Sequence, residues 1–253
     1  DGLGLFNIST ASAFVVAAAG GKVAKHGNRS ISSKSGSADV LEAAGINLNL
    51  SPEVISECIE KIGVGFMFAP AHHSAMKHAI GPRKELAVRT IFNVLGPLTN
   101  PAKAPNQVIG VYDRNLVEPI ANVLKSLNSR HVMVVHSADG LDEFSIADKT
   151  FVAELYNDEV STYSVHPDDF GLKLGNLDDI KAENADESLS LIYEAFSGHN
   201  GTAKNIIALN AGAAIYVSGL EETLNSGIEK AFKILSDGSA KEKLEEYIFA
   251  SNN

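Results

Sequence analysis

The sequence predicts an α/β protein in which a mixed, largely parallel sheet is flanked by helices. Strand-like apolar runs at 107–112 and 131–136 enclose a helical pattern at 116–127, an alternation typical of parallel strands joined by helices. Residues 151–165 alternate about Asn157-Asp158, which predicts a hairpin and makes the sheet mixed. The rest of the chain reads as helices separated by glycines, at 188–197, 202–217 and 223–250.

The amino-terminal part reads as a helix followed by a strand and a polar loop. Ser9 or Ser12 can cap the helix, which ends at Ala19 before two glycines. The polar run that comes later is a loop by its composition. The elements after the first helix are expected at 22–26 (strand), 27–37 (loop) and 39–44 (helix).

A second helical region begins at a strong start signal. Ser51-Pro52-Glu53 combines an oxygen cap, a proline in the first turn and an acid near the positive end of the helix dipole. Cys58 lies in the apolar stripe of this helix, so we expect it in the core, and Gly63 ends the helix. Residues 71–90 read as a more basic helix interrupted by a Gly-Pro pair, and 96–101 as a rigid connector.

The composition narrows the class of protein. The 253 residues carry 31 acidic and 21 basic side chains, for a net charge of −10, which argues against a general nucleic-acid or anionic-membrane binder. The single cysteine excludes a disulfide framework and a cysteine-rich zinc site, and predicts a cytoplasmic protein. The most apolar stretch, 13–19, is shorter than the roughly 20 residues that span a bilayer, and no basic residue precedes it as a signal peptide requires.

Three polar clusters lie at junctions between the expected elements, where α/β proteins bind ligands. The first, at residues 7–10, starts the amino-terminal helix. Free N–H groups, short hydroxyls and the helix dipole suit a phosphate at such a position. The alternative is that Ser9 and Thr10 only cap the helix.

The second cluster runs from Lys25 to Ser37. It combines Lys25, His26 and Arg29 with glycines and several serines. Amides freed by glycine, hydroxyl donors and a lysine charge together describe a cradle for a diphosphate. The alternative is an ordinary solvated loop.

The third cluster is Asp142-Glu143, which follows an expected strand and a glycine turn. Adjacent carboxylates in this position can hold Mg²⁺ together with phosphate oxygens. The alternative is a hydrated turn.

The expected helix at 71–90 carries histidines and basic residues but no continuous acidic partner face; His73 and Lys77, for example, are four residues apart. A zinc helix of the His-Glu-x-x-His type is absent. A basic helix facing a carboxylate substrate is the functional interpretation, and an exposed helix is the alternative. The chain also has neither a serine nucleophile elbow nor a nucleotide phosphate loop, so no nucleophilic side chain is predicted.

Taken together, the clusters resemble the anthranilate phosphoribosyltransferase family of tryptophan biosynthesis over nearly the whole chain. The most characteristic string runs from Arg89 to Pro101. The other strings that carry the resemblance are 7–12, 25–29, 32–39, 68–70 with His73 and Arg83, 139–143 and 210–214. The resemblance implies a nucleoside phosphorylase/phosphoribosyltransferase-like fold. It also implies a glycosyltransferase that moves the phosphoribosyl group of 5-phosphoribosyl 1-diphosphate to the amine of anthranilate and releases diphosphate.

The resemblance further implies a role for individual residues, none of them a nucleophile. Phosphoribosyl diphosphate would be bound by Asp1, Leu5, Asn7, Ser9, Thr10, Lys25, Ser33 and Ser37, with Leu5 standing where the family usually has threonine. Anthranilate would be held by Asn28 at its amine, by Arg83 at its carboxylate, and by His26, Pro70 and His73 around its ring. Two Mg²⁺ ions would be coordinated through the diphosphate by Ser9, Asp142 and Glu143.

The family pattern divides the chain into 1–50 and 93–253, which belong to the α/β domain, and 51–92, which belongs to the helical domain. Family members begin with a helical segment and a glycine-rich loop, and this chain begins at the Asp of that loop, so we expect a cropped or fragmentary chain. The family is generally homodimeric and binds neither nucleic acid nor membranes. The alternatives are a pyrimidine nucleoside phosphorylase-like enzyme and an inactive or nucleic-acid-binding paralogue or fragment; the carboxylate pair, the 93–101 string and the acidic charge favour the transferase.

Overall fold

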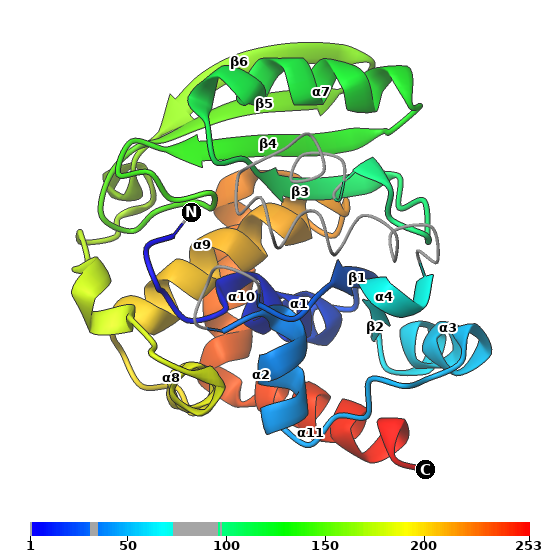
Figure 1. The fold of residues 1–253 in the computed structure, drawn as a ribbon. Helices are drawn as coiled ribbons and strands as arrows, with labels where there is room; N and C mark the ends of the chain where they lie inside the picture. Colours follow the sequence, from blue (N-terminus) through cyan, green and yellow to red (C-terminus); the bar gives the residue numbers. More distant parts are fainter. Residues whose placement is uncertain (1, 31–34, 73–95, 97) are drawn as a thin grey trace, which may run out of the picture.

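The computed structural model describes residues 2–30, 35–72, 96 and 98–253, and its larger sheet has four strands of mixed direction with helices on both faces (Figure 1). The strands lie in the order β3-β4-β5-β6. Their bounds are Asn106–Gly110, His131–Ser137, Thr150–Tyr156 and Glu159–Val165. β3 pairs with β4 in parallel, whereas the pairs β4–β5 and β5–β6 are antiparallel.

The two faces of this sheet contribute to two cores. Along β4, Val132 and Val134 pack toward α7 (Val117–Ser126), while Met133 and Val135 belong to the larger core on the other face. This division follows from the alternation of side chains along a strand. In Figure 1, α7 covers one face of the sheet and α9 (Thr202–Val217) lies across the other.

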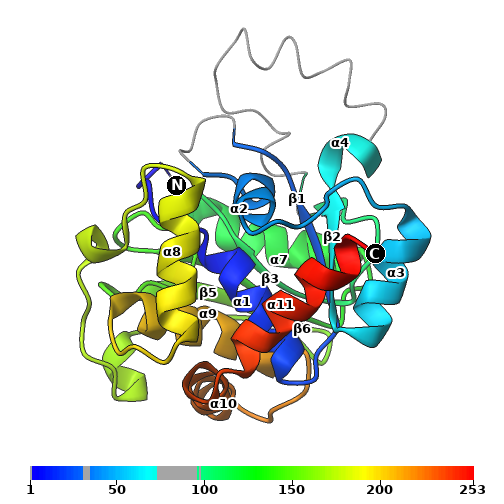
Figure 2. The ribbon, with the colours of Figure 1, turned by 90° about the horizontal axis from the view of Figure 1, so that it is seen from below.

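A layer of helices lies beyond α9. It contains α1 (Ile8–Ala18), α8 (Ala185–Phe196), α10 (Leu224–Asp237) and α11 (Ser239–Ser251). α1 packs against α9, α10 and α11, and the view from below shows it in the middle of this layer (Figure 2). From Ile8 to Ala17 every residue of α1 is buried except Ser9.

A second, two-stranded sheet lies beside this layer. β1 (Val23–Gly27) pairs in parallel with β2 (Val64–Phe68), so the carboxyl ends of the two strands meet at one edge. The chain between and after them forms α2 (Ser37–Ala43), α3 (Pro52–Lys61) and the short α4 (Ala69–His72). Single turns of 3-10 helix complete the described elements, at Arg114–Leu116, Pro167–Phe170 and Leu177–Ile180.

The structure confirms the mixed α/β class, the buried position of Cys58 and the helix at 202–217. Among the described strands, parallel and antiparallel pairings are equal in number. The hairpin turns at Asn157 and Asp158, whose φ angles of 50° and 62° fit the two-residue turn that follows the twist of paired strands.

The prediction that Ser9 or Ser12 caps α1 was wrong. The side chain of Asn7, and not that of Ser9 or Ser12, accepts the hydrogen bond at the helix start. Most of the basic helix expected at 71–90 lies outside the described residues, and the division into 1–50, 51–92 and 93–253 stays a prediction. Within the part of the chain that the structure describes, no helix combines the length and apolar character needed to cross a membrane.

Candidate active site

The site is built around the amino end of α1. Asn7 Oδ1 accepts a hydrogen bond from the N–H of Thr10 at 3.1 Å, and its own N–H donates to Ser188 Oγ on α8 at 2.9 Å. Because Asn7 performs the capping, the Thr10 hydroxyl is not needed for it. Thr10 is 1% exposed, and its Oγ1 has no hydrogen-bond partner among the described residues. Burying a hydroxyl without a partner costs about 1–3 kcal/mol, so this end of the helix is suited to a ligand with hydrogen-bonding atoms.

Lys25 on β1 reaches the same helix end. Its Nζ donates to Ser9 Oγ at 3.0 Å. Burial lowers the pKa of Lys25 to about 8, and the Glu143 carboxylate acts in the opposite direction. The ammonium group therefore remains charged at neutral pH. It faces Ser9, the one exposed residue between Ile8 and Ala17.

Glu143 comes from a third element, the loop between β4 and β5. The N–H of Ser9 donates to its carboxylate. Burial and the neighbouring Asp142 carboxylate raise the pKa of Glu143 to about 8, against the opposing effects of Lys25 and of the Ser9 N–H group. Ser9, Lys25 and Glu143 thus meet at one place, although they lie far apart in the sequence.

The loop that carries the carboxylates, residues 138–149, is held by hydrogen bonds. Ser137 Oγ donates to the carbonyl of Glu143 at 2.7 Å, and the N–H of Ser145 donates to Thr150 Oγ1 at 3.1 Å. Gly110 at the end of β3 lies against this loop, since a Cβ atom on Gly110 would be 1.4 Å from the carbonyl oxygen of Asp142. The pair Asp142-Glu143 is therefore half-buried and fixed, which argues against a merely hydrated turn.

The polar loop after β1 has well-defined borders. Asp39 Oδ2 accepts hydrogen bonds from the N–H groups of Ser30 and Gly36, both at 2.9 Å, and so draws the two ends of the loop together. A Cβ atom on Gly36 would lie 2.4 Å from the Ser30 nitrogen, so only glycine fits there. Ser35 is buried, and its Oγ has no partner among the described residues.

Arg29, a basic residue of the second polar cluster, forms an ion pair with Glu42. The guanidinium of Arg29 makes a two-pronged contact with the Glu42 carboxylate, in which Nη2 donates to Oε1 at 2.6 Å. Arg29 is thus neutralised within its own loop. Among the described residues, the positive charge that faces the Ser9–Glu143 junction comes from Lys25.

Three of the five residues expected to bind anthranilate are described, and they lie at the carboxyl edge of the small sheet. His26 lies on β1, Asn28 follows that strand, and Pro70 is in α4 directly after β2, whose Phe68 pairs with Gly27. Asn100, from the characteristic string, donates through Nδ2 to the carbonyl of Ala24 at 3.0 Å and ties that segment to β1.

The remaining expected site residues are more loosely placed. Ser37 begins α2, and its Oγ donates to the carbonyl of Asn28 at 3.4 Å. Leu5 forms an antiparallel bridge with Lys181 and packs its side chain against the core, so only its main chain is available to a ligand. Asp1, Ser33, His73 and Arg83 lie outside the described residues.

The donor set at this site fits a hard divalent cation. No group of three or more His, Cys, Asp or Glu side chains that could hold a metal occurs within residues 2–30, 35–72, 96 and 98–253. Asp142 and Glu143 offer two crowded carboxylates beside the Ser9 hydroxyl. Mg²⁺ is usually bound in this way, by one or two carboxylates together with substrate phosphates and water.

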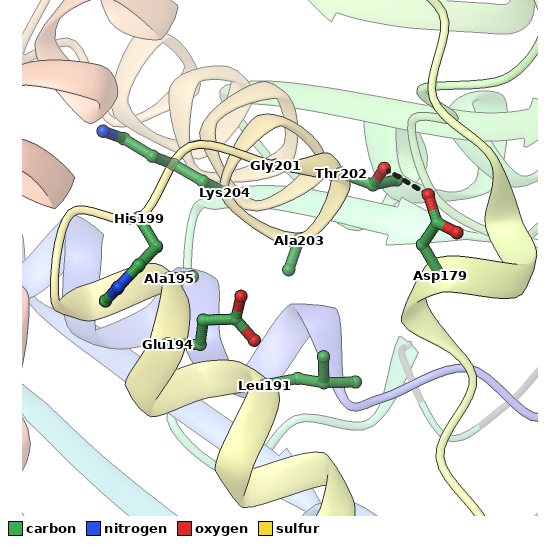
Figure 3. Close-up of a pocket in the computed structure, with 9 residues that line it drawn as sticks. All are labelled: Asp179, Leu191, Glu194, Ala195, His199, Gly201, Thr202, Ala203 and Lys204. Carbon is green, nitrogen blue, oxygen red and sulfur yellow. Dashed lines mark hydrogen bonds between the residues drawn. The ribbon is translucent and has the colours of Figure 1, made fainter.

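A separate pocket of about 200 Å³ lies between α8 and the start of α9 (Figure 3). Its lining includes the acids Asp179 and Glu194, and Thr202 donates to Asp179 at 3.2 Å. Lys204 Nζ is engaged by the Gly198 carbonyl and by the Asn200 and Ser236 side chains. None of the residues predicted from the sequence to form the site belongs to this pocket.

Sequence reasoning assigned no role to three residues that shape the site. Ser137 and Gly110 hold the main chain of the carboxylate loop, and Asn210 on α9 holds its last part. The role of Gly110 could not be predicted from the sequence, because glycine occurs at strand ends for many different reasons. Asn210 gave a weak signal, since it is a polar residue within the otherwise apolar run 206–215.

The comparisons with known proteins agree with this geometry. A family model described as "Glycosyl transferase family, a/b domain" matches residues 1–241. An anthranilate phosphoribosyltransferase of Ruthia magnifica subsp. Calyptogena magnifica is 70% identical over 253 residues, which are all of this chain and 75% of that protein.

Two solved structures extend the agreement to three dimensions. The anthranilate phosphoribosyltransferase of Thermus thermophilus superimposes with a TM-score of 0.93 at 40% identity, covering 99% of this chain and 74% of that one. The Saccharomyces cerevisiae enzyme in complex with PRPP and Mg superimposes with a TM-score of 0.89 at 29% identity, covering 100% of this chain and 71% of that one. The chain belongs to the anthranilate phosphoribosyltransferase family.

Proposed function

We propose that the junction of Ser9, Lys25 and Glu143 is where this family member transfers the phosphoribosyl group of 5-phosphoribosyl 1-diphosphate to the amine of anthranilate. This step of tryptophan biosynthesis releases diphosphate. The proposal is carried by one observation: a helix amino terminus, a half-buried lysine and a carboxylate pair, from three elements, face one another. The relatives support this reading and not a nucleoside phosphorylase or a nucleic-acid-binding paralogue.

Charge neutralisation drives the proposed reaction. The C1–O bond to diphosphate breaks, the anthranilate nitrogen forms a new bond to C1, and that nitrogen loses a proton. The free N–H groups at the start of α1 and the Lys25 ammonium would bind the phosphate oxygens, since both favour anions. Mg²⁺, when bound, neutralises the departing diphosphate. No covalent intermediate with the protein is needed, and the residues act by positioning and electrostatics.

The finer assignments follow the same logic. Ser9, Asp142 and Glu143 would coordinate two Mg²⁺ ions, and Asn7, Thr10 and Ser37 would join Lys25 in holding the phosphates. Asn28 would bind the anthranilate amine and Arg83 its carboxylate, with His26 and Pro70 beside the ring. Thr10 supports the phosphate assignment, because its buried hydroxyl has no other partner among the described residues.

We further propose a cytoplasmic homodimer. The cytoplasmic location rests on the charged, phosphorylated substrate and on a single buried cysteine, which suits a reducing compartment. The dimer rests on the resemblance to the family alone. Size measurement in solution by sedimentation tests it, and a monomer at working concentration would contradict it.

The activity is tested by mixing the full-length protein with phosphoribosyl diphosphate, anthranilate and Mg²⁺ and following anthranilate fluorescence. A decrease that requires both Mg²⁺ and phosphoribosyl diphosphate is expected. Uridine or thymidine with inorganic phosphate serves as the control for the phosphorylase alternative. Release of free base in that control, with no change in anthranilate fluorescence, would overturn the proposal.

A further inference from the structure

We propose that Asn210 is a positioning residue for the metal site: from α9 it grips the main chain of Phe144 and thereby fixes the direction of Asp142 and Glu143. The inference rests on the proposed function of the carboxylate pair, and it adds a residue that touches neither substrate nor metal. Asn210 lies on the helix across the sheet from α7, well away from the phosphate-binding residues in sequence.

The side-chain amide of Asn210 satisfies both polar groups of one residue. Its Oδ1 accepts from the N–H of Phe144 at 2.9 Å, and its Nδ2 donates to the carbonyl of Phe144, also at 2.9 Å. Nδ2 donates a second hydrogen bond to the carbonyl of Ile206, one turn earlier on α9, at 2.9 Å. These contacts fix which end of the amide is oxygen, because the reversed amide would place donor against donor and acceptor against acceptor.

The hydrogen bonds between Asn210 and Phe144 are buried. Phe144 is 2% exposed and Asn210 is 7% exposed, so water has little access to the hydrogen bonds between them. If the amide is removed, a buried N–H and a buried carbonyl lose their partners. Leaving such a buried group without a partner is unfavourable, and the response that costs least is a shift of the main chain toward water.

Such a shift moves the carboxylates directly. Three consecutive residues of this loop are each held by a different element: Asp142 against Gly110 of β3, Glu143 by Ser137 of β4, and Phe144 by Asn210 of α9. The first two contacts involve carbonyl groups only, whereas Asn210 bonds both the N–H and the carbonyl of Phe144 and so fixes the two peptide units that flank this residue. Misplacement by about 1 Å at an active site can cost on the order of 10²-fold in rate.

α9 also connects the two halves of the site. α9 packs along α1, whose amino end carries Ser9. Through Asn210, α9 also forms hydrogen bonds with the loop that carries Glu143. The spacing between the hydroxyl and the carboxylate that would share a metal ion is therefore set by one rigid element. We infer that Asn210 contributes to the Mg²⁺ affinity and to turnover, and not to anthranilate binding.

The test compares Asn210→Ala with Ile215→Ala, a cavity variant of another fully buried residue on the same helix. Mn²⁺ binding in the presence of inorganic diphosphate, followed by electron paramagnetic resonance, reads the metal site without turnover. Steady-state kinetics give the Mg²⁺ concentration for half-maximal rate and the KM for anthranilate. Removing an outer support of a metal site typically weakens affinity by about 10–100-fold.

We expect Asn210→Ala to weaken Mn²⁺ binding and raise the Mg²⁺ requirement about tenfold or more, with the KM for anthranilate within about twofold of wild type. Ile215→Ala is expected to lose stability but keep wild-type Mn²⁺ affinity. Equal Mn²⁺ affinity in wild type and Asn210→Ala would overturn the inference and leave a purely structural residue.

A milder variant guards against failure to fold. Asn210→Ser keeps a hydroxyl that can donate to the Ile206 carbonyl one turn earlier but loses the paired contacts with Phe144, so a loss of Mn²⁺ affinity in the same direction is expected. Wild-type affinity in a folded Asn210→Ser would contradict the inference. A wild-type protein that binds Mn²⁺ but forms no product would instead contradict the proposed function, while the Mn²⁺ comparison would still decide the role of Asn210.

Discussion

Lys25 Nζ lies 3.0 Å from Ser9 Oγ, so the ammonium group of a strand in the small sheet and the first exposed hydroxyl of a buried helix face the same space. Neither α1 nor β1 contains an acidic residue that could pair with Lys25. The Glu143 carboxylate faces both of them from a third direction. The charge balance of the site therefore depends on what binds between these groups.

Replacing Lys25 by Met should raise the KM for phosphoribosyl diphosphate about tenfold or more, because a charged hydrogen bond to a phosphate is worth about 1.5–3 kcal/mol. The KM for anthranilate should change much less. Steady-state kinetics with each substrate varied in turn measure both values. Lys22→Met is the matched control, since Lys22 is exposed and pairs with Glu60; a similar loss in both variants would contradict a specific role for Lys25.

Asp142→Asn should lower the Mg²⁺-dependent rate by at least about tenfold, because one of two carboxylates that would hold the ion loses its charge. Excess Mg²⁺ should restore part of the rate. Initial rates over a Mg²⁺ titration provide the measurement. Asp139→Asn, in the same loop, is the control for loop geometry, since Asp139 accepts hydrogen bonds from Leu141 and Ser145; a rate loss without any change in the Mg²⁺ requirement would argue against Asp142 as a ligand.

Gly110→Ala should damage the site through the main chain. The new methyl group would overlap the carbonyl of Asp142, and relief of such overpacking typically costs about 1–3 kcal/mol. Both the free energy of unfolding and the apparent Mg²⁺ affinity should fall, as measured by urea denaturation and by kinetics. Gly201→Ala is the control, because nothing lies within 4 Å of a Cβ atom there. Unchanged Mg²⁺ affinity in Gly110→Ala would show that the loop tolerates displacement.

The stability of the molecule should depend on Glu154 and on pH. Burial opposes ionisation of this carboxyl, but hydrogen bonds from His131, Tyr163 and Tyr216 outweigh it and hold the pKa of Glu154 below its ordinary value. A carboxyl with a lowered pKa in the folded state stabilises above its unfolded pKa and loses that contribution as the pH falls through the folded value. The stabilisation should therefore be complete at pH 7, well above the ordinary glutamate pKa of about 4.3, and be lost as the pH falls below that value and through the lower folded-state pKa.

Urea denaturation of wild type and Glu154→Gln tests this dependence. Wild type should be more stable at pH 7 by about 1–3 kcal/mol, and the difference should shrink as the pH is lowered toward 3. Transferase activity at neutral pH should be unaffected, because the His131–Glu154 pair lies near the start of β4, whereas the carboxylate loop follows the end of that strand. A difference that is the same at both pH values would contradict the assigned ionisation.

The elements with strong local signals were predictable from the sequence. Helix α9 begins and ends at the predicted residues, and the Asn157-Asp158 turn forms because both residues tolerate a positive φ. The meeting of residues 7–10, 25 and 143 was predicted only through the resemblance to a family. Periodicity alone says which segments are strands or helices, and not which of their ends lie together.

The predictions that failed concern residues whose roles depend on partners elsewhere in the chain. Asn7, Ser9 and Thr10 can all cap a helix, and Asn7 is selected because Ser188, 181 residues away, holds its main chain. Arg29 looked like part of the cradle because the sequence does not show that Glu42 takes up its charge. Asn210 could not be assigned a role, since its partner is the backbone of Phe144, and backbone groups leave no mark in a sequence.

The enclosure of α1 has a consequence for ligand protection. Binding residues usually lie on segments that open easily, whereas here Ser9 sits at the start of a helix whose following residues to Ala17 are all buried. The amides of α1 should therefore be among the slowest in the molecule to exchange with solvent, even without substrate. A polyanion bound at this end would stabilise the folded state by an amount that grows with the logarithm of its concentration above Kd, so that substrate binding and resistance to global unfolding rise together.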